Sequence, residues 1–176
     1  MRLHSKLMLV ILLLIISIGV IFEVTFKNIM ETNLKHEIGS KALAVAQSIV
    51  KMPDIQQAFQ AENPAAAIQP IAESIRKQVG AEFIVIGNRN EIRYSHPNPK
   101  RLGKKMVGGD NGLVFKGESV ISESIGTLGP SLRGKAPIFY QGEVIGVVSV
   151  GYLQMDIEKE VVKIQKKIFF ATFLIL

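Results

Sequence analysis

A long apolar run near the N-terminus limits what this chain can fold into more than any other feature. Residues 7–22 are apolar except for Ser17 and Gly19, and continuing through Val24 and Phe26 gives the ~20 residues that a helix needs to cross a bilayer. The run has no polar face, which disfavours a helix packed into a soluble domain. A membrane helix is therefore predicted here.

The residues around this run predict its orientation and its fate. Arg2 and Lys6 precede it, and the positive-inside rule places them in the cytoplasm, so the chain from Lys27 onward lies outside. A cleaved signal peptide shares the charged start and the apolar middle. The run ends in bulky side chains such as Phe22 and Val24, without a small-x-small cleavage site. We therefore favour an uncleaved anchor over a signal peptide.

The C-terminal residues repeat this pattern. Residues 168–176 are almost purely apolar and follow Lys163, Lys166 and Lys167. This segment alone is too short to span, so we expect it to begin a second membrane helix that continues beyond Leu176. The alternative is a short amphipathic helix on the surface. We therefore expect this chain to be a multi-pass cell-membrane protein with three parts. Residues 1–27 are a cytoplasmic start and the first membrane helix, residues 28–152 an extracytoplasmic ligand-binding domain, and residues 153–176 a connecting helix and the start of the second membrane helix.

The first part of the outer domain has helical patterns. Apolar residues recur at near-helical spacing from Lys27 to Val50, so this helix is predicted to continue out of the first span. Asn63-Pro64 is typical of a helix start and Gly80 of a helix end. Pro70 lies between them, so that helix either begins there or kinks.

After Gly80 the pattern changes to short β-prone runs separated by turn residues. The candidate strands are residues 83–86, 91–94, 113–115, 119–122, 132–140 and 144–150, the last two forming a hairpin around Gln141-Gly142. About five antiparallel strands are expected. The order of elements predicts an α+β domain with helices packed on one face of an antiparallel sheet.

Two basic clusters suggest a site for an anion. Arg93 and His96 stand at the end of one predicted strand, and Arg133 and Lys135 lie two apart within another, so the latter pair projects from one face with Ser131. Arginine offers a planar fork and lysine a compact charge, and both bind carboxylates. The alternatives stay open: Arg133 and Lys135 could pair with Asp or Glu on a solvated strand, and His96 could be an ordinary loop residue.

Several classes of function are disfavoured. The chain has no Cys and three His, which argues against a metal site, and it lacks a phosphate-binding loop, a dinucleotide fingerprint and a nucleophile elbow. Ser95 beside His96 is the one near pair for a hydrolase, and sequence neighbours rarely face each other productively. Much of the positive charge flanks the predicted spans, which argues against nucleic acid. No catalytic residue, metal ligand or cofactor is predicted, and a purely structural anchor remains an alternative.

Four segments in this order carry a resemblance: Arg93-x-x-His96-Pro97, Gly-Gly-Asp at 108–110, Gly-Thr-Leu-Gly-Pro-Ser-Leu-Arg-Gly-Lys-Ala-Pro at 126–137, and Val-Ile-Gly-Val-Val-Ser-Val-Gly at 144–151. Together they resemble the extracytoplasmic PAS-like sensor domain of the citrate and C4-dicarboxylate sensor histidine kinases, the CitA/DcuS type. The resemblance covers nearly the whole chain and implies a PAS-like sheet with a long N-terminal helix.

The resemblance also implies a carboxylate pocket. Arg93 and His96 would hold one end of the ligand, and Arg133 and Lys135 the other. Further hydrogen bonds would come from Thr127, which stands where Ser is expected in close citrate sensors, from the backbone of Leu128, and from Ser149. A lysine two residues after the arginine resembles the citrate branch, so citrate is favoured, while malate, fumarate and succinate remain open.

The same resemblance implies the partners of the chain. The expected partners are a second copy in a homodimer, the lipid bilayer, and, in the full protein, a cytoplasmic kinase part and a response regulator. Ligand binding is expected to move the last strand and, through it, the second membrane helix. The ectodomain of a chemoreceptor, binding a C4-dicarboxylate, is the alternative.

Overall fold

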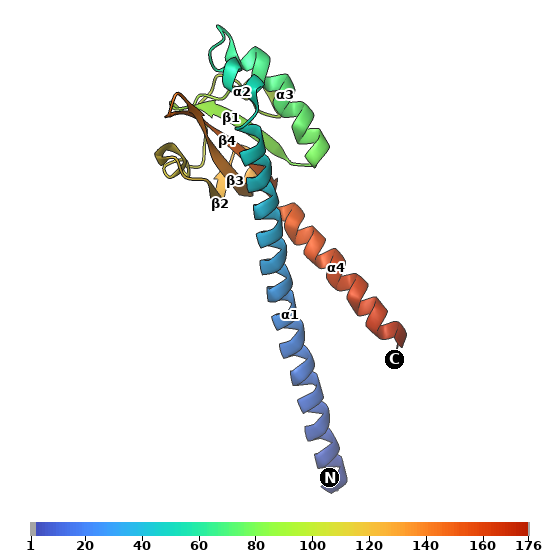
Figure 1. Ribbon diagram of the computed structural model, residues 1–176. Coiled ribbons are helices and arrows are strands. Elements are labelled where there is room, and N and C mark those ends of the chain that lie inside the picture. Colours follow the sequence, from blue (N-terminus) through green and yellow to red (C-terminus); the bar gives the residue numbers. More distant parts are fainter. Residues whose placement is uncertain (1–2, 176) are drawn as a thin grey trace. The chain divides into compact units, whose positions relative to one another are not determined.

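The computed structural model of the protein describes residues 3–175, shown in Figure 1. The described part contains α1 (Leu3–Ile49), α2 (Pro53–Ala58), α3 (Pro64–Val79), β1 (Phe83–Asn88), the short 3-10 helices η1 (Pro99–Arg101) and η2 (Val114–Lys116), β2 (Val120–Gly126), β3 (Gly129–Tyr140), β4 (Glu143–Leu153) and α4 (Gln154–Ile175). Residues 35–157 form one compact unit, and the described residues before and after them belong to a second unit.

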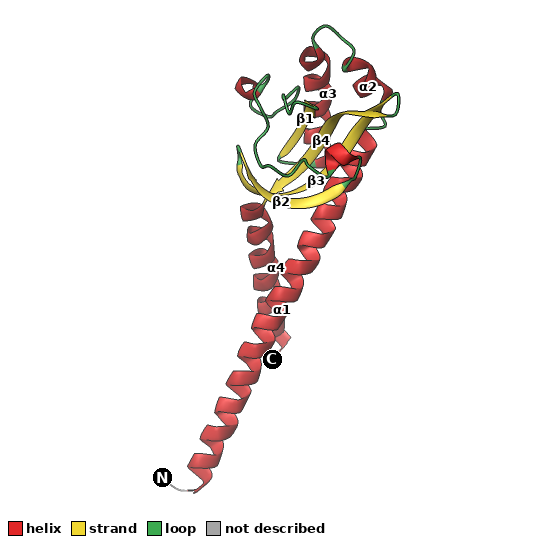
Figure 2. Cartoon of the chain, turned by 90° about the vertical axis from the view of Figure 1, so that its left-hand side faces the viewer, coloured by secondary structure: helices red, strands yellow, loops and turns green. Residues whose placement is uncertain are grey.

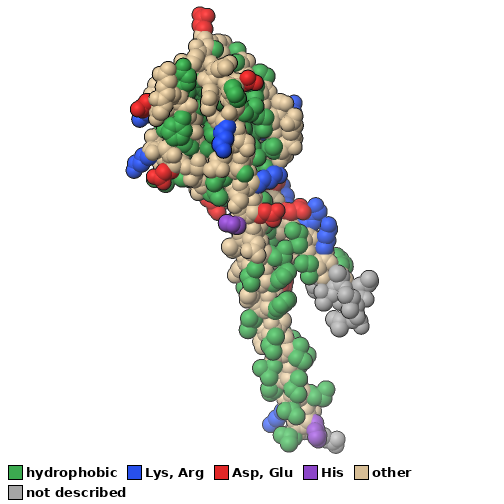
Figure 3. Space-filling model, in the orientation of Figure 1, with side chains coloured by type: hydrophobic (Ala, Val, Ile, Leu, Met, Phe, Trp, Pro, Cys, Tyr) green, Lys and Arg blue, Asp and Glu red, His purple; other side chains and the backbone are tan. Residues whose placement is uncertain are grey.

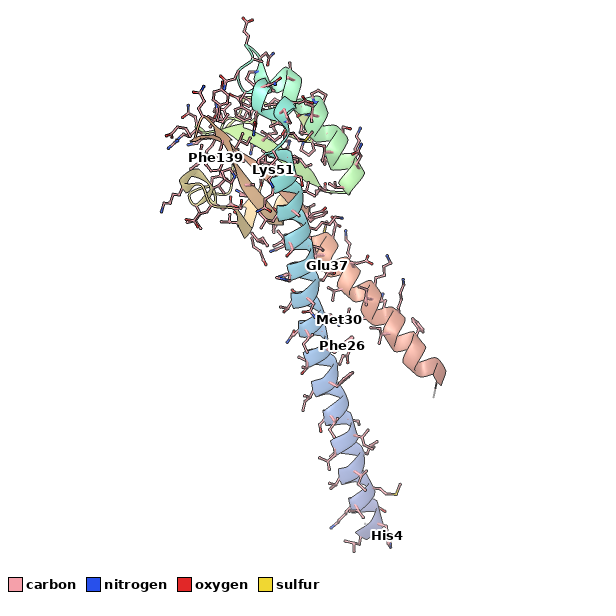
Figure 4. All side chains as sticks on the ribbon, in the orientation of Figure 1. His4, Phe26, Met30, Glu37, Lys51 and Phe139 are labelled. Carbon is pink, nitrogen blue, oxygen red and sulfur yellow. The ribbon has the colours of Figure 1, made fainter. Side chains whose placement is uncertain are left out.

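Helix α1 runs without a break for 47 residues, which confirms that the apolar run and the following helical pattern form one helix. Its most apolar window of 18 residues has a mean hydropathy of 3.0 and is not buried at all, and within the described residues α1 is the one helix long and apolar enough to cross a membrane. Figure 3 shows apolar side chains along this part of α1, and Figure 4 shows side chains standing out all round it between His4 and Phe26.

The C-terminal turns of α1 pack against the sheet through small residues. Gly39, Ala42 and Ala46 are buried. At Gly134 on β3, a Cβ atom would overlap with the backbone of Ala42 and Leu43, so the strand approaches the helix more closely than any other residue type allows. This close approach places α1 directly over the centre of the sheet.

The four strands form an antiparallel sheet in the order β1-β4-β3-β2. Alternate residues of each strand point to opposite faces. On one face, Ile84, Ala136, Val148 and their neighbours join the apolar core together with residues of α1, α2 and α3. On the other face, Figure 2 shows the long connection between β1 and β2 drawn in green, and this connection covers part of that face.

The sheet has four strands where about five were expected, because two of the six candidate strands do not form. The segment 91–94 makes isolated bridges at Arg93 and Ile92 and no continuous ladder. The reason is a tight turn, in which the Asn88 side chain accepts hydrogen bonds from two backbone N–H groups and Glu91 has a positive φ of 63°. The segment 113–115 instead contributes to η2, which ends at Gly117 with φ 96°.

The predicted start of α3 at Asn63-Pro64 and its predicted end at Gly80 are confirmed. Asn63 Oδ1 accepts a hydrogen bond from the N–H of Ala66 at 3.3 Å, and Gly80 ends the helix in the left-handed conformation with φ 66°. Of the two possibilities for Pro70, a helix start there is wrong, because α3 begins at Pro64 and continues through Pro70. Ala66, whose carbonyl loses its partner, is exposed to water.

Helix α4 follows β4 directly and includes most of the expected second membrane segment, whose final residue, Leu176, lies outside the described residues, as does Arg2 at the other end. Within the described part, α4 does not meet the length and apolarity that α1 meets. The second span therefore remains a prediction.

Candidate ligand-binding site

A pocket lies on the face of the sheet opposite the helices. It is lined by residues from β1, β3, β4, the β1–β2 connection and the β2–β3 turn: Phe83, Val85, Arg93, His96, Met106, Val107, Gly126, Thr127, Leu128, Arg133 and Ser149. The structure thus brings six of the seven predicted site residues around one pocket. The seventh, Lys135, does not line it. The register places Lys135 opposite the lining residue Ser149, but the Lys135 ammonium is bonded to Asp110 and Asn111 instead of reaching the pocket.

Arg93 is buried beside this pocket, and no acidic side chain in the described part of the chain forms an ion pair with it. Its side chain is 3% exposed, and among the residues that the structure describes its Nε is the one buried side-chain nitrogen or oxygen without a hydrogen bond. Desolvation lowers the pKa of Arg93, and the nearby charges of Arg101 and Arg133 lower it further. A buried guanidinium surrounded by other cations is unfavourable unless an anion binds to it.

His96 is held in one orientation by the chain around it. Its Nδ1 accepts a hydrogen bond from the N–H of Asn98 at 2.9 Å, so in the neutral ring Nε2 carries the proton and donates to Thr127 Oγ1, also at 2.9 Å. Gln69 on α3 bonds both the N–H and the C=O of His96. Burial lowers the pKa of His96, and the charge of Arg93 lowers it further.

Arg133 makes several contacts within the protein. Its Nε donates to Ser131 Oγ at 2.9 Å, its Nη2 to the Ser124 carbonyl at 3.3 Å, and its Nη1 to Asp110 Oδ1 at 3.2 Å. The guanidinium also lies over the Phe83 ring, 5.7 Å from the ring centroid. Burial lowers the pKa of Arg133, while the Asp110 carboxylate opposes this shift.

Lys135 is enclosed more completely. It is 1% exposed, and its Nζ donates to Asp110 Oδ1 and to Asn111 Oδ1, both at 2.6 Å. Asp110 also accepts a hydrogen bond from Ser122 Oγ at 2.7 Å. Burial alone would raise the pKa of Asp110, but the hydrogen bonds from Lys135 and Ser122 and the two nearby cations lower it below its ordinary value. The sequence left two hypotheses for Arg133 and Lys135: binding an anion, or pairing with Asp or Glu on a solvated strand. The acidic partner of the second hypothesis is present as Asp110, but both cations are buried and not solvated.

Asp110 is the main residue of this site that sequence reasoning missed. It belongs to the Gly-Gly-Asp segment, which was noted as part of a pattern but was given no role. Two glycines before an acidic residue were the available signal, because they permit the backbone to approach the cations closely. With His96 neutral, the cations Arg93, Arg133 and Lys135 and the carboxylate of Asp110 give the site a net charge of +2.

The four-stranded antiparallel sheet, the long N-terminal helix and this pocket define a PAS-like domain. Residues 29–166 match the family model described as single cache domain 3, and the chain belongs to this family. The chain is 49% identical over 157 residues to the sensor protein CitS of Halalkalibacterium halodurans, and 38% identical over 133 residues to the sensor histidine kinase CitA of Klebsiella pneumoniae. These alignments cover 88% and 74% of this chain, but 29% and 24% of the relatives.

Solved structures agree with this assignment. The crystal structure of the Escherichia coli DcuS sensor domain has a TM-score of 0.69 and 32% identity, and the match covers 73% of this chain and 97% of that one. The Vibrio cholerae DctB sensor domain has the same TM-score at 14% identity, which shows the fold alone. The predicted PAS-like α+β fold and the resemblance to the CitA/DcuS type are thus confirmed. The chain spans less than a third of the curated relatives that it matches.

Proposed function

We propose that this chain is the sensing part of a transmembrane sensor histidine kinase and that its pocket binds citrate or a related di- or tricarboxylate. The observation that supports this most is Arg93, a buried guanidinium whose Nε has no partner, at a pocket that also contains Arg133 and His96. The fold does not need Arg93 there for an internal ion pair. An anion entering the pocket would supply the missing hydrogen bonds.

The chemistry of the lining fits a small organic acid. Arg93 and His96 would bind one carboxylate, and Arg133 with Lys135 would bind another. Thr127, the backbone of Leu128 and Ser149 would add neutral hydrogen bonds. Each hydrogen bond to a charged group contributes roughly 1.5–3 kcal/mol, so three or four of them give about micromolar affinity after the costs of association.

Citrate is the favoured ligand for two reasons. Lys135 supplies an additional cation, as expected for a tricarboxylate. The chain is also more similar to the relatives named CitS and CitA, at 49% and 38% identity, than to Escherichia coli DcuS, at 30%. We test the choice by comparing citrate with malate, fumarate and succinate.

The proposed route of the signal follows the chain. Ser149 lies on β4, and β4 passes into α4 without an intervening loop. A ligand that draws β3 and β4 together would displace the start of α4, and it can do so only by its differential affinity for the two states. In this proposal, parts 1–27, 28–152 and 153–176 are the first span, the outer sensor domain and the connection to a second span. A homodimer would pass the signal to a cytoplasmic kinase and its response regulator.

The test is calorimetry on the full chain in lipid nanodiscs, titrated with the four carboxylates. Micromolar citrate binding, with weaker binding of the dicarboxylates, supports the proposal. No heat from any of them at millimolar concentration contradicts it and favours a structural anchor. Joining the chain to a histidine kinase then tests signalling: phosphorylation that saturating citrate leaves unchanged would contradict the proposed route and favour a chemoreceptor output.

A further inference from the structure

Asp110 occupies the position at the β3 cations where a ligand carboxylate is expected. Its Oδ1 atom lies 2.6 Å from Lys135 Nζ and 3.2 Å from Arg133 Nη1, so a single carboxylate oxygen is shared between the two cations. Charge-assisted hydrogen bonds of this kind are the ones that an incoming carboxylate would make. While Asp110 is bound there, Lys135 has no exposed surface to offer a ligand.

The size of the pocket leads independently to the same point. It has about 30 Å³ that the centres of water molecules can reach. A single water needs roughly 10–15 Å³ by this measure, so the pocket has room for a few waters and not for a tricarboxylate. Some part of the lining has to move before such a ligand can enter.

The Gly-Gly-Asp loop (residues 108–110) is suited to be that part. Gly108 and Gly109 have φ of 133° and 67°, and a Cβ atom on Gly108 would collide with Arg133 and lie 2.8 Å from Asp110 Oδ1. Neighbouring Val107 is 53% exposed. Among the described residues, the loop is held on the sheet by the hydrogen bonds of Asp110 and by one from Ser124 Oγ to the Gly108 carbonyl at 2.9 Å. Just before the loop, Arg133 Nη1 donates to the Val107 carbonyl at 3.5 Å.

We propose that Asp110 is a tethered competitor of the ligand: it binds Arg133 and Lys135 in the free protein, and a ligand carboxylate displaces it together with the Gly-Gly-Asp loop. The inference rests on the proposed function and deepens it, because it makes Asp110 the residue that sets the affinity of the site. A ligand that binds only the open form has an apparent Kd raised in inverse proportion to the open fraction. Removing the charge of Asp110 raises that fraction.

The test compares the wild-type chain with Asp110→Asn, using one tricarboxylate (citrate) and one dicarboxylate (succinate) in calorimetry. The variant should bind both ligands about tenfold more tightly, since a displaced carboxylate costs both ligands the same. Their affinity ratio should therefore stay within about twofold of wild type. Glu118→Gln, which removes the same charge from an exposed position, is the matched control and should leave both affinities unchanged.

Two outcomes would overturn the inference while leaving the proposed function intact. Unchanged affinities in Asp110→Asn would show that the carboxylate does not compete. A gain for citrate much larger than for succinate would show that Asp110 stays in place as a fixed counter-charge, because a fixed charge repels the more highly charged ligand more strongly. If neither ligand binds the wild type or any variant, the proposed function itself fails.

A second variant guards against misfolding of Asp110→Asn. Ser122→Ala removes one hydrogen bond that holds Asp110, and Ser122 Oγ makes no hydrogen bond to either cation, so affinity should rise for both ligands by a few-fold. Since the chain has no Cys, a fluorophore on Gly112→Cys, two residues after Asp110 and outside the pocket lining, reports this segment without touching the ligand site. Its emission should change on adding citrate to the wild-type background. A label that is silent while citrate binds would overturn the inference.

Discussion

The two faces of the sheet differ in chemistry although the same strands build both. On the helix-facing side, Ile84, Ile138 and Val150 are completely buried among residues of α1, α2 and α3. On the pocket side, the adjacent positions include Arg133 and Ser149, which are buried just as deeply but are polar or charged. Burial alone therefore does not separate the parts of this molecule that stabilise it from those that we propose to bind a ligand.

The difference lies in how the buried groups are satisfied. Apolar residues on the helix face stabilise the folded state because they are removed from water. Charged residues on the pocket face need a partner, which is Asp110 for Lys135 and, in our proposal, the ligand for Arg93. Substitutions on the helix face should thus change the free energy of unfolding, and substitutions on the pocket face should change affinity. Five predictions test that division, beginning with the largest effect.

Gly134→Ala should have the largest effect on stability. The new Cβ would overlap with the backbone of α1, which cannot move as a flexible side chain can, so we expect a loss of about 4 kcal/mol or more. Urea denaturation followed by circular dichroism measures it. Gly112→Ala is the control, because its Cβ meets nothing within 4 Å. A loss under ~1 kcal/mol would show that β3 does not pack closely against α1 at Gly134.

Ile84→Ala and Val85→Ala form a matched pair on neighbouring positions of β1. Ile84 is 0% exposed in the core, and its truncation should cost about 2–5 kcal/mol of unfolding free energy with little change in ligand affinity. Val85 lines the pocket, so its truncation should cost less stability and change affinity more. Denaturation and calorimetry on both variants give the comparison. Equal stability losses with equal affinity changes would mean that the two faces are not separable.

Arg93→Ala should show the opposite pattern. Citrate affinity should fall by about 2–4 kcal/mol, because one ligand carboxylate loses its charged donor. The free energy of unfolding should stay constant or rise, since a buried Nε without a partner is removed. Arg89→Ala, whose side chain is 59% exposed, is the control and should leave affinity unchanged. An affinity loss under ~0.5 kcal/mol for Arg93→Ala would show that Arg93 does not bind the ligand.

The sequence was sufficient for those parts of the fold that depend on neighbouring residues. Asn63, Pro64 and Gly80 mark the ends of α3 by their own backbone chemistry, and two β-prone runs around the turn at Gln141-Gly142 mark β3 and β4. The strand expected at 91–94 was wrong because the Asn88 side chain takes the N–H groups that a strand would use. The turn prevailed over the strand there through a side-chain contact that a pattern of apolar residues does not reveal.

For the site, the resemblance supplied residues that periodicity could not. Local spacing predicted that Arg133 and Lys135 share a face, and the structure agrees with that geometry. Their shared partner is 25 residues from Lys135 in the sequence, and Gln69 is 27 residues from His96. Such pairings depend on how the β1–β2 connection and α3 fold back onto the sheet. They follow from tertiary structure, which explains why Asp110 was noticed but not given a role.

The smallest expected effect is a pH dependence from His96 on the pocket face. Burial and the charge of Arg93 lower the pKa of His96, so the folded state favours the neutral ring. Its contribution to stability is then complete above the ordinary pKa of about 6.5 and is lost as the pH falls below that value. His96→Gln should flatten this decline, and His36→Gln, an exposed residue on α1, should not. Denaturation at about pH 7.5 and about pH 5.5 measures the difference.

A bound carboxylate should reverse the preference of His96, because an anion near Nε2 favours the protonated ring and raises its pKa. Citrate binding near neutral pH should therefore take up a proton, which calorimetry detects as a dependence of the binding heat on the ionisation enthalpy of the buffer. The dependence should disappear in His96→Gln. Equal proton uptake in the wild type and in His96→Gln would mean that another group titrates. In that case, the difference between the two faces would be explained by Arg93 and by the ion pairs of Asp110, without any contribution from the imidazole.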